Sequence, residues 1–430
     1  MTVPNAYQLQ PVETEIMEPL EYDCVVIGAG PAGCTAASIV AEAGHRTLLL
    51  DRESFPRFHV GESLMPEVFW PLQRLGLVDR MKHSRFVRKH SVQFVTHNGK
   101  DSDPFFFQDH DRRESSLTWQ VERADFDKML FDRAAELGAD CWDETRVLDV
   151  LFDDDQRCTG VVVRDRDGNT RQIRARVVMD GSGQQSLIAS KLGLKHVDAN
   201  LKKAAIWSYW KDAIRDPDDN AGATIILHTE KKDSWFWFIP LSDGITSVGC
   251  VGDNDYLLRR ETDTEQTYRD EIAICPGLLP RLDAAKQIGK THVAKEYTYT
   301  TTRHAGEGWV LIGDAFGFID PIYSSGVYFA MVTGERAADA VVEGFAKADL
   351  SERQLSAWCD DFKNGATWVR KLVEAFYTKE FSFGGFMRQH PEYRGNLTDL
   401  LIGRIFHKGV GDIFNDMDPA IQQSLASGKM

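Results

Sequence analysis

A glycine-rich turn near the start of the chain has the residue types and the spacing that bind a dinucleotide. Residues 28–33 read GAGPAG, which fits G-x-G-x-x-G, between a short apolar run and an alanine-rich stretch with helical spacing. Gly28 permits the tight turn, Gly30 lets the backbone approach a pyrophosphate, and Gly33 lets helix and strand pack closely. Free N–H groups and the helix dipole favour a phosphate there. We therefore expect the cofactor to contact Gly28, Gly30, Ala32 and Gly33.

An acidic residue stands where a dinucleotide site needs one. Residues 47–50 form a second apolar run that ends at Asp51, 23 residues after Gly28. A carboxylate at this place accepts a hydrogen bond from a ribose hydroxyl. A chance glycine turn is the alternative, but strand, turn, helix, strand and acid occur in the order of a βαβ unit. The sequence predicts that Asp51 belongs to the cofactor site.

Three later segments resemble the FAD-binding fold of the hydroxylase-like flavoproteins. Residues 121–127 (VERADFD) resemble the V-x-R-x-x-F-D element, whose arginine, here Arg123, approaches the flavin side of the cofactor. Residues 180–183 (DGSG) resemble the second glycine turn of that fold. Residues 313–315 (GDA) resemble its third element, whose acid, here Asp314, approaches the ribityl and phosphate region. Because the three occur in the expected order, the resemblance implies FAD rather than NAD.

A tryptophan pair bears on what the flavin is used for. Residues 235–240 (WFWFIP) fit W-x-W-x-I-P, which resembles the signature of the flavin-dependent halogenases. The resemblance implies that Trp235 and Trp237 form a wall between the flavin and the substrate cavity. Their bulk would keep the substrate away from the flavin and so disfavour hydroxylation.

A proline-containing turn indicates an anion site. Residues 318–326 (FIDPIYSSG) resemble the F-x-x-P-x-x-S-x-G element of the same family. The backbone N–H groups of Ser325, Gly326 and Val327 would point outward together at the start of a helix, and such a nest binds an anion without a charged side chain. The resemblance implies a halide, chloride or bromide, at Ser325 and Gly326 beside the flavin, with Val327 in the cofactor site. The alternative is that Ser324 and Ser325 are ordinary helix N-caps.

Lys89 stands where the halogenase family has its essential lysine, after an expected helix at 66–82 and before an expected strand at 91–96. An amine at the end of an apolar cavity can hydrogen-bond hypohalous acid and polarise its halogen, or form a haloamine. Burial would lower its pKa and make the neutral amine available. The ordinary alternative is a solvated lysine, and the neighbouring Arg88 is the rival for the role.

The resemblance also implies the reaction and the partners. Reduced FAD and dioxygen oxidise a halide to hypohalous acid, which then substitutes an electron-rich ring electrophilically. A separate flavin reductase supplies the reduced FAD in this family, and the sequence shows no second nicotinamide-binding element. Tyr323 replaces the glutamate of the tryptophan halogenases, which favours a phenol or pyrrole-like substrate, free or tethered to a carrier protein.

Other functions share parts of this pattern. A single-component flavin monooxygenase needs the FAD elements but neither W-x-W-x-I-P nor the lysine. A flavin-dependent reductase of isoprenoid double bonds uses the same fold. A flavin-binding protein without turnover belongs to another class. Residues 61–66 (GESLMP) resemble a family segment near the flavin ring, although Glu62 could equally cap a helix that begins at Pro66.

Composition limits the classes of partner. The chain has 430 residues, a net charge of −15 and a pI of about 5.3, which argues against nucleic acid and anionic membrane surfaces. Seven scattered cysteines without a C-x-x-C pair predict neither a disulfide framework nor a metal site. Because the sequence has no signal pattern and no apolar run of about 18 residues, we expect a cytoplasmic protein without a membrane segment.

The elements that must position these residues define an α/β fold. A parallel sheet with helices on both faces is expected to carry the glycine turns, with a mostly antiparallel sheet inserted on the substrate side. The resemblance implies the FAD-binding hydroxylase-like fold of the glutathione reductase type. The expected units are a flexible leader at 1–20, an FAD-binding domain at 21–375 with the inserted sheet at about 86–120 and 200–302, and a helical C-terminal extension at 376–430.

Two local interpretations accompany this fold. The segment 98–116, with phenylalanines at 105–107, is either a lid with an apolar tip or a hairpin whose phenylalanines belong to the core. Helical patterns are expected at 326–342, 352–379 and 391–414.

Overall fold

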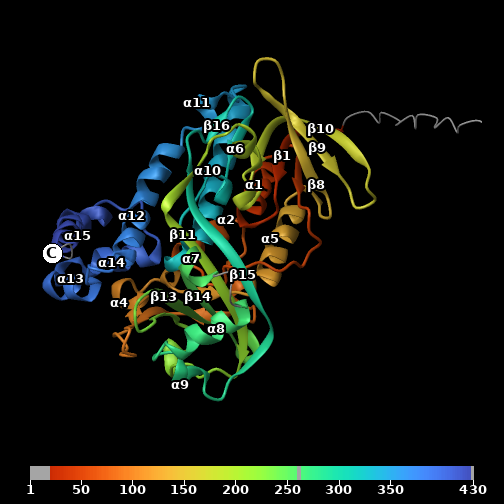
Figure 1. Cartoon of the computed structure of the whole chain (residues 1–430). Helices are drawn as coiled ribbons and strands as arrows, with labels where there is room; N and C mark the ends of the chain where they lie inside the picture. Colours follow the sequence, from red (N-terminus) through yellow and green to blue (C-terminus); the bar gives the residue numbers. More distant parts are fainter. Residues whose placement is uncertain (1–19, 259–262, 428–430) are drawn as a thin grey trace, which may run out of the picture.

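The first sheet carries the glycine turns on parallel strands. A computed structural model describes residues 20–258 and 263–427, so most of the expected leader lies outside the described residues (Figure 1). The strands of this sheet follow the order β16 (Ala305–Gly306), β17 (Trp309–Leu311), β10 (Thr170–Asp180), β1 (Leu20–Ile27), β2 (Thr47–Leu50) and β7 (Asp140–Trp142), with β9 (Cys158–Arg164) and β8 (Arg146–Phe152) continuing from β10. Strand β1 pairs in parallel with β2 and β10, and β10 pairs in parallel with β17. The carboxyl ends of these strands therefore meet at one edge.

The second sheet is the inserted one. Its order is β18 (Gly317–Phe318), β15 (Lys286–Thr301), β11 (Lys195–Lys211), β14 (Ile245–Asp253), β13 (Ser234–Pro240), β12 (Thr224–His228), β4 (Ser91–Val95) and β5 (Phe105–Phe106). Its described pairings are antiparallel except for β12 with β4. A separate ribbon of β3 (Val87–Lys89) and β6 (Thr118–Gln120) lies beside it. The predicted mixed architecture of a parallel and an antiparallel sheet is confirmed.

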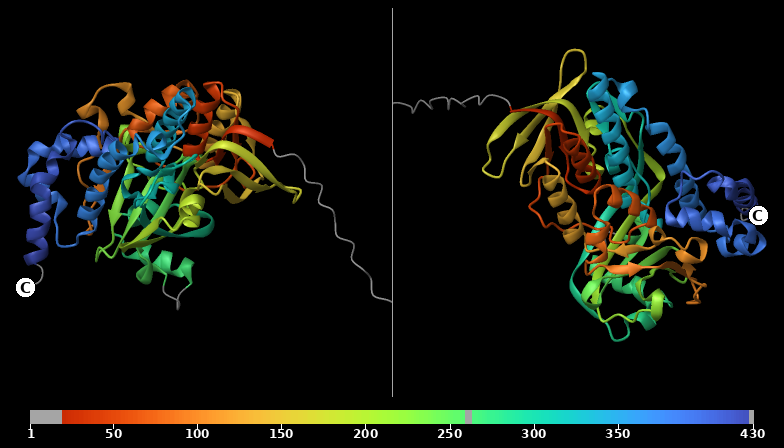
Figure 2. Two further views of the ribbon diagram at one scale, coloured as in Figure 1. Left: turned by 90° about the horizontal axis from the view of Figure 1, so that it is seen from above. Right: turned by 180° about the vertical axis from the view of Figure 1, so that it is seen from behind.

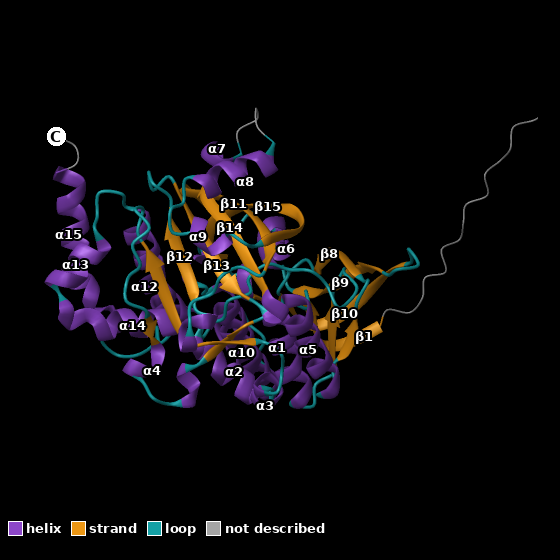
Figure 3. Cartoon of the chain, turned by 90° about the horizontal axis from the view of Figure 1, so that it is seen from below, coloured by secondary structure: helices purple, strands orange, loops and turns teal. Residues whose placement is uncertain are grey.

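Helices cover both sheets. Figure 3 shows α7 (Asn254–Leu257) and α8 (Thr264–Ala273) on one side of the second sheet and α10 (Gly326–Lys347) on the other. Helix α1 (Pro31–Glu42) packs so closely on α10 that a Cβ at Gly334 would lie 2.4 Å from the carbonyl oxygen of Ala32. The other helices before the C-terminal group are α2 (Phe69–Arg74), α3 (Val78–Lys82), α4 (Phe107–His110), α5 (Arg123–Glu136), α6 (Leu187–Lys191), α9 (Leu279–Leu282) and α11 (Glu352–Leu355).

The C-terminal helices form one end of the molecule, opposite the hairpins of β8, β9 and β10 (Figure 2). They are α12 (Cys359–Tyr377), α13 (Phe383–Gln389), α14 (Arg394–Ile402) and α15 (Phe414–Ser427). Helix α12 returns to the second sheet, where Phe376 stacks on His228 with ring centroids 5.0 Å apart. None of the helices in the described part of the chain is long and apolar enough to cross a membrane.

Several local expectations differ from the structure. The helix expected at 66–82 is divided, because Gly76 adopts φ +68° between α2 and α3. The helix expected at 352–379 is also two helices. The helical segment expected at 391–414 is interrupted after α14, where Gly403 adopts φ +103°, and α15 begins only at Phe414. Within the segment 98–116, Phe107 is fully buried in the core while Phe105 and Phe106 are half-buried, which favours the hairpin interpretation over the lid.

Candidate active site

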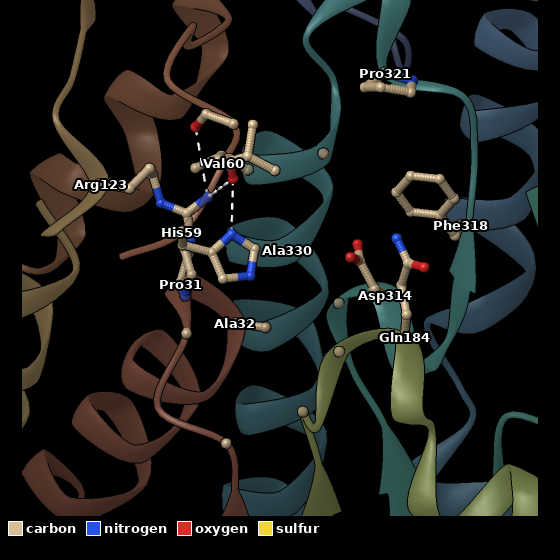
Figure 4. A pocket seen from close by; sticks show the side chains of 18 of the residues that line it. Pro31, Ala32, His59, Val60, Arg123, Gln184, Asp314, Phe318, Pro321 and Ala330 are labelled. Carbon is tan, nitrogen blue, oxygen red and sulfur yellow. Dashed lines mark hydrogen bonds between the residues drawn. The ribbon is translucent and has the colours of Figure 1, made fainter. Parts of the chain in front are cut away.

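A cavity of about 510 Å³ lies where the two sheets meet, within the usual size of a small-molecule site. Figure 4 shows Arg123 and His59 on one side of it and Asp314 and Gln184 on the other. The cavity collects residues that are far apart in the sequence. Those predicted from the sequence that line it are Gly28, Gly30, Ala32, Asp51, Arg123, Trp235, Trp237, Asp314, Gly326 and Val327. Gly33, Lys89 and Ser325 are predicted site residues that do not line it.

The glycine turn has the geometry that its spacing predicts. Gly28 adopts φ +88°, and a Cβ there would lie 2.3 Å from the carbonyl oxygen of Gly181. A Cβ at Gly33 would lie 1.8 Å from the carbonyl oxygen of Gly28, so Gly33 allows the contact of α1 with the turn rather than contact with a ligand. Gly30 is the N-cap of α1 and has no side chain to cover the first N–H groups. This end of the cavity fits a pyrophosphate.

Asp51 is held rigidly at the end of β2. Its two carboxylate oxygens accept hydrogen bonds from the backbone N–H groups of Ala29 (2.8 Å) and Glu53 (3.0 Å). Its Oδ2 lies 3.6 Å from Nη2 of Arg57, which also pairs with Asp127 at 3.0 Å. The carboxylate is thus fixed against the glycine turn, at the edge of the cavity where a ribose would follow the pyrophosphate.

Arg123 is buried and fully engaged. It donates to both carboxylate oxygens of Asp127, at 2.7 and 2.9 Å, and Nη1 donates to the carbonyl oxygen of Val60 at 2.8 Å. His59 approaches the same carbonyl oxygen through Nδ1 at 2.7 Å (Figure 4). The nearby Arg123 charge lowers the pKa of His59 to about 4. The wall of the cavity here combines the Arg123 guanidinium, paired with Asp127, with a neutral imidazole.

Asp314 faces Arg123 across the cavity. Burial raises the pKa of Asp314 to about 6, against the opposing effect of Arg123 and Lys195. Its peptide is fixed because Tyr299 donates to its carbonyl oxygen and the N–H of Gly313 donates to the Thr333 hydroxyl at 2.7 Å. The carboxyl group is therefore positioned to accept from a polyhydroxyl chain.

The tryptophan wall follows from the alternation of strand β13. Trp235 and Trp237 point into the cavity, while Phe236 and Phe238 point to the other face and pack in a second core with Tyr268 of α8. The two indoles lie 6.5 Å apart between ring centroids. Trp237 lies directly over Gly249 of β14, where a Cβ would be 2.1 Å from the indole ring.

The turn before α10 positions backbone donors at the cavity. Asp320 caps the short helical turn 321–323 by accepting from the N–H of Ile322 at 3.1 Å, and Ser324 adopts φ +60°. Ser325 is buried and is the N-cap residue of α10, but its hydroxyl makes no capping hydrogen bond. Ser325 thus occupies the N-cap position without the side-chain hydrogen bond of an ordinary cap, and its hydroxyl does not cover the N-terminus of the 22-residue helix.

Lys89 is a buried amine, not a solvated one. Its side chain is 2% exposed, and Nζ donates to Oγ of Ser63 at 2.9 Å and to the carbonyl oxygen of Leu64 at 3.1 Å. Burial lowers the pKa of Lys89 to about 7. Its rival Arg88 is half-buried and stacks over the Trp119 ring at 4.4 Å. Lys89 reaches the cavity through Ser63, which lines it.

Several residues of the site were not predicted from the sequence. Glu62 lines the cavity, accepts from the Tyr209 hydroxyl at 2.7 Å, and has a pKa raised to about 7 by burial. It does not cap the helix at Pro66, whose N-cap is Met65 without a side-chain bond. Thr224 also lines the cavity. The segment 61–66 gave a signal for Glu62 and Ser63, whereas nothing in the sequence marks Thr224 or Tyr209.

Known proteins share this arrangement. The profile of a family described as FAD binding domain matches residues 21–338. A Pseudomonas fluorescens chlorinase named for 1H-pyrrole-2-carbonyl on a peptidyl-carrier protein is 29% identical and covers 90% of each chain. A brominase from Pseudoalteromonas luteoviolacea named for the same carrier-bound pyrrole is 31% identical and covers 90% of this chain and 92% of its own.

Solved structures agree. Flavin-dependent brominase Bmp2 superposes with a TM-score of 0.83 at 30% identity, covering 94% of this chain and 100% of that one. The myxobacterial chondrochloren halogenase CndH gives a TM-score of 0.79 at 30% identity, covering 93% and 97%.

The fold and the glycine cradle thus define an FAD-binding protein of the hydroxylase-like class, and that prediction is confirmed. The similarity over nearly the full length identifies a narrower class of protein. The chain belongs to the flavin-dependent halogenases, which are oxidoreductases. The family expected from the tryptophan signature is also confirmed.

Proposed function

We propose that this halogenase uses reduced FAD and dioxygen to oxidise chloride or bromide, and substitutes an electron-rich ring with the help of Lys89. The observation that carries the proposal is the burial of Lys89 one hydrogen bond behind a cavity that also holds the FAD cradle and the tryptophan pair. A flavin monooxygenase has no need of an amine in that place. The pKa near 7 leaves both the ammonium and the amine available at neutral pH.

The residues that line the cavity fit FAD. The turn at Gly28 and Gly30 would hold the pyrophosphate, Asp51 the ribose, Asp314 the ribityl chain, and Arg123 the flavin side. Ala32 and Val327 would contact the cofactor through their backbones at the starts of α1 and α10. When bound in its reduced form, FAD supplies with dioxygen the oxidation that turns halide into hypohalous acid.

The turn before α10 would hold the halide. The N–H groups of Gly326 and Val327 lie in the first turn of a 22-residue helix, so they combine free donors with the positive end of its dipole. Ser325 would contribute through its backbone. Placing an anion there needs no charged side chain, and the neighbouring tryptophans would exclude water from it.

The tryptophan pair would separate the place where the oxidant forms from the ring that it attacks. Trp235 and Trp237 stand on the cavity side of β13 and are held by hydrogen bonds from their indole N–H groups, to Tyr377 at 3.0 Å and to Ser247 at 3.1 Å. Fixed bulk of this kind keeps a substrate ring from direct contact with the flavin. This arrangement would favour halogenation over hydroxylation.

The residue at position 323 bears on which class of ring the protein can halogenate. Tyr323 is buried, and its hydroxyl donates to the carbonyl oxygen of Leu372 at 3.3 Å, so this position offers no carboxylate to an indole. A phenol or pyrrole carries its own activating group and does not need one. Two relatives are named for a pyrrole on a carrier protein. We propose such a ring, free or carrier-tethered, with reduced FAD supplied by a separate reductase.

Mass spectrometry of a substrate panel tests the proposal. Phenols, pyrroles and indoles, free and carrier-bound, are incubated with the protein, bromide, dioxygen and FAD kept reduced. Wild type should give brominated product, Lys89→Ala should give none while still oxidising reduced FAD, and Arg88→Ala serves as the matched neighbour that retains activity. Hydroxylated products, or rapid NADPH oxidation without a reductase, would instead identify a monooxygenase.

A further inference from the structure

Two hydroxyl groups stand between Lys89 and the cavity. Oγ of Ser63 and Oγ1 of Thr224 lie 2.7 Å apart, and both residues line the cavity. The pair is almost sealed from bulk solvent, with exposed fractions of 4% for Ser63 and 2% for Thr224. The two residues are 161 positions apart in the sequence and meet where the segment before η1 (Pro66–Val68) approaches the start of β12.

While Lys89 is an ammonium, the directions of the hydrogen bonds around this pair are set by their donors. Ser63 accepts from Nζ of Lys89 at 2.9 Å, and Thr224 accepts from Nε2 of Gln120 at 2.9 Å. The amide of Gln120 cannot be reversed, because the same Nε2 also donates to the carbonyl oxygen of Gly222 at 2.9 Å. Each hydroxyl oxygen of the pair therefore already accepts one bond from outside it.

One of the two hydroxyl hydrogens cannot take part in the bond between Ser63 and Thr224. Only one hydrogen can lie between the two oxygens, so Ser63 donates to Thr224 or Thr224 donates to Ser63. In either state the second hydroxyl hydrogen points elsewhere, and both side chains border the cavity. Exchange of the two states turns the free hydroxyl hydrogen from one oxygen to the other, which is the reorientation that resets a hydroxyl chain after it has passed on a proton.

Lys89 is the only charged member of this chain of contacts. Its Nζ donates to Ser63 and to the carbonyl oxygen of Leu64, both inside the protein, and lies 5.7 Å from the Phe107 ring centroid. Because Lys89 does not line the cavity while Ser63 does, a small oxidant in the cavity meets the hydroxyl pair before it meets the amine.

We propose that the Ser63–Thr224 pair binds hypohalous acid and carries protons between it and Lys89. The inference rests on the proposed function and names two further catalytic residues of the same reaction. In the forward step the ring carbon bonds to the halogen and the oxygen–halogen bond breaks. The departing hydroxide takes a proton from the pair and leaves as water, and the pair is resupplied by the Lys89 ammonium.

The second half of the step restores the ring. The substituted carbon loses its proton, the electron pair of that C–H bond returns to the aromatic system, and the proton passes through the pair to the Lys89 amine. The sum is hypohalous acid and arene giving haloarene and water, with Lys89 and both hydroxyls unchanged. The ring carbon is oxidised by two electrons and the halogen is reduced by two, so no further reactant is needed.

The test compares two substitutions of threonine by valine near Lys89. Thr224→Val removes a hydroxyl of the pair. Thr118→Val is the matched control, because Thr118 is also fully buried and lies opposite Lys89 in the β3–β6 ribbon, but its hydroxyl donates at 3.3 Å to the carbonyl oxygen of Met65 and does not line the cavity. Product formation and oxidation of reduced FAD are followed in single turnovers with bromide.

Thr224→Val and Ser63→Ala should each slow ring bromination about 100-fold, the usual contribution of positioned proton transfer, with oxidation of reduced FAD unchanged. Thr224→Ser, which keeps the hydroxyl, should restore the rate to within about threefold of wild type, and Thr118→Val should match wild type. Equal rates for Thr224→Val and Thr118→Val, or no recovery in Thr224→Ser, would overturn the relay.

A second measurement does not depend on turnover. Ser63→Ala removes an acceptor from the Lys89 ammonium, so the pKa of Lys89 should fall below that of wild type. It is read from ¹³C NMR of protein labelled at the lysine Cε, and Thr118→Val should leave it unchanged. A Lys89 pKa that does not respond to Ser63→Ala contradicts the contact on which the relay depends. Absence of any halogenated product from wild type would instead refute the proposed function, before the variants are compared.

Discussion

The indole N–H of Trp235 donates at 3.0 Å to the hydroxyl of Tyr377, the last residue of α12 and 142 positions away. Tyr377 in turn donates at 2.9 Å to Oδ2 of Asp320, whose other oxygen accepts from the N–H of Ile322 at 3.1 Å. The chain of bonds joins the tryptophan wall to the turn that precedes α10. The wall and the proposed halide turn are therefore held as one unit by a C-terminal helix.

Tyr377→Phe should loosen that unit. The change leaves the indole N–H of Trp235 and the buried carboxyl of Asp320 each without this partner, which costs about 1–3 kcal/mol in the free energy of unfolding. With the wall mobile, hypohalous acid should escape, so less substrate and more of a bulky trap in solution should be halogenated per reduced FAD consumed. Chemical denaturation and trap bromination measure the two effects.

Tyr393→Phe is the control for this change. Its hydroxyl also donates to a carboxylate, that of Asp416 at 2.6 Å, but the bond is exposed and lies in the C-terminal helices away from the cavity. Tyr393→Phe should change neither the free energy of unfolding nor the share of the trap that is brominated. Unchanged partition between substrate and trap in Tyr377→Phe would show that α12 does not hold the wall.

Trp235→Ala should change the product rather than stop the reaction. Removal of the indole opens the wall, so an aromatic substrate can approach the flavin and receive oxygen instead of halogen. Hydroxylated product detected by mass spectrometry, absent from wild type, is the expected result. Trp70→Ala removes an indole that is 42% exposed and outside the cavity lining, and it should leave the products unaltered. Products of Trp235→Ala identical to those of wild type would contradict the role of the wall.

The sequence predicted the parts of the site that depend on local geometry. The turn at Gly28 requires a positive φ, which is a local property that the glycine itself indicates. The two-residue period of a strand was enough to place Trp235 and Trp237 on one face. The broken helix at 66–82 shows the limit of periodicity, since the apolar pattern continues across Gly76 although the backbone does not.

Contacts between distant segments could not be predicted. The burial of Lys89 depends on Ser63, Leu64 and Phe107, which come from other elements. Thr224 joins Ser63 across 161 residues, and a threonine at the start of a strand carries no signal of its own. Ser325 shows another limit, because the sequence left a side-chain cap open as an alternative, and only the structure shows Ser325 at the N-cap position without that hydrogen bond.

Glu62→Gln should stabilise the apoprotein at neutral and higher pH. Burial raises the pKa of Glu62 from 4.5 to about 7, so folding favours its protonated form. The stabilising contribution of such a group is complete below its unfolded pKa and is lost as the pH rises through the folded value. Wild type should therefore lose stability relative to Glu62→Gln between pH 4.5 and 7, by up to about 3 kcal/mol.

Urea denaturation of both proteins at several pH values measures that difference. Gln keeps an acceptor for the Tyr209 hydroxyl, so the comparison isolates the charge. Glu21→Gln, at a side chain that is 72% exposed, is the control and should give a difference that does not change with pH. A constant difference for Glu62→Gln would mean that the carboxyl is not buried as described.

Lys89→Met should show the opposite slope. Burial lowers the pKa of Lys89 from 10.5 to about 7, so between these values the unfolded chain binds a proton that the folded chain does not. The linkage relation then makes wild type more stable as the pH rises through this window, and the penalty of a buried ammonium is complete below pH 7. Met has a similar length without the charge, so the variant lacks this dependence.

The comparison that decides the point is the stability of Lys89→Met minus that of wild type, at pH 7 and pH 10. Lys89→Met should have the larger free energy of unfolding at pH 7, and its excess over wild type should shrink by about 4 kcal/mol between pH 7 and pH 10. Lys363→Met, which removes an exposed lysine paired with Asp360 at 2.6 Å, should give a difference that stays flat over the same range. This experiment needs neither FAD nor substrate. A stability difference that does not change between pH 7 and pH 10 would show directly that the Lys89 amine titrates as it does in water. Lys89 would then be no better suited to the chemistry than an exposed lysine.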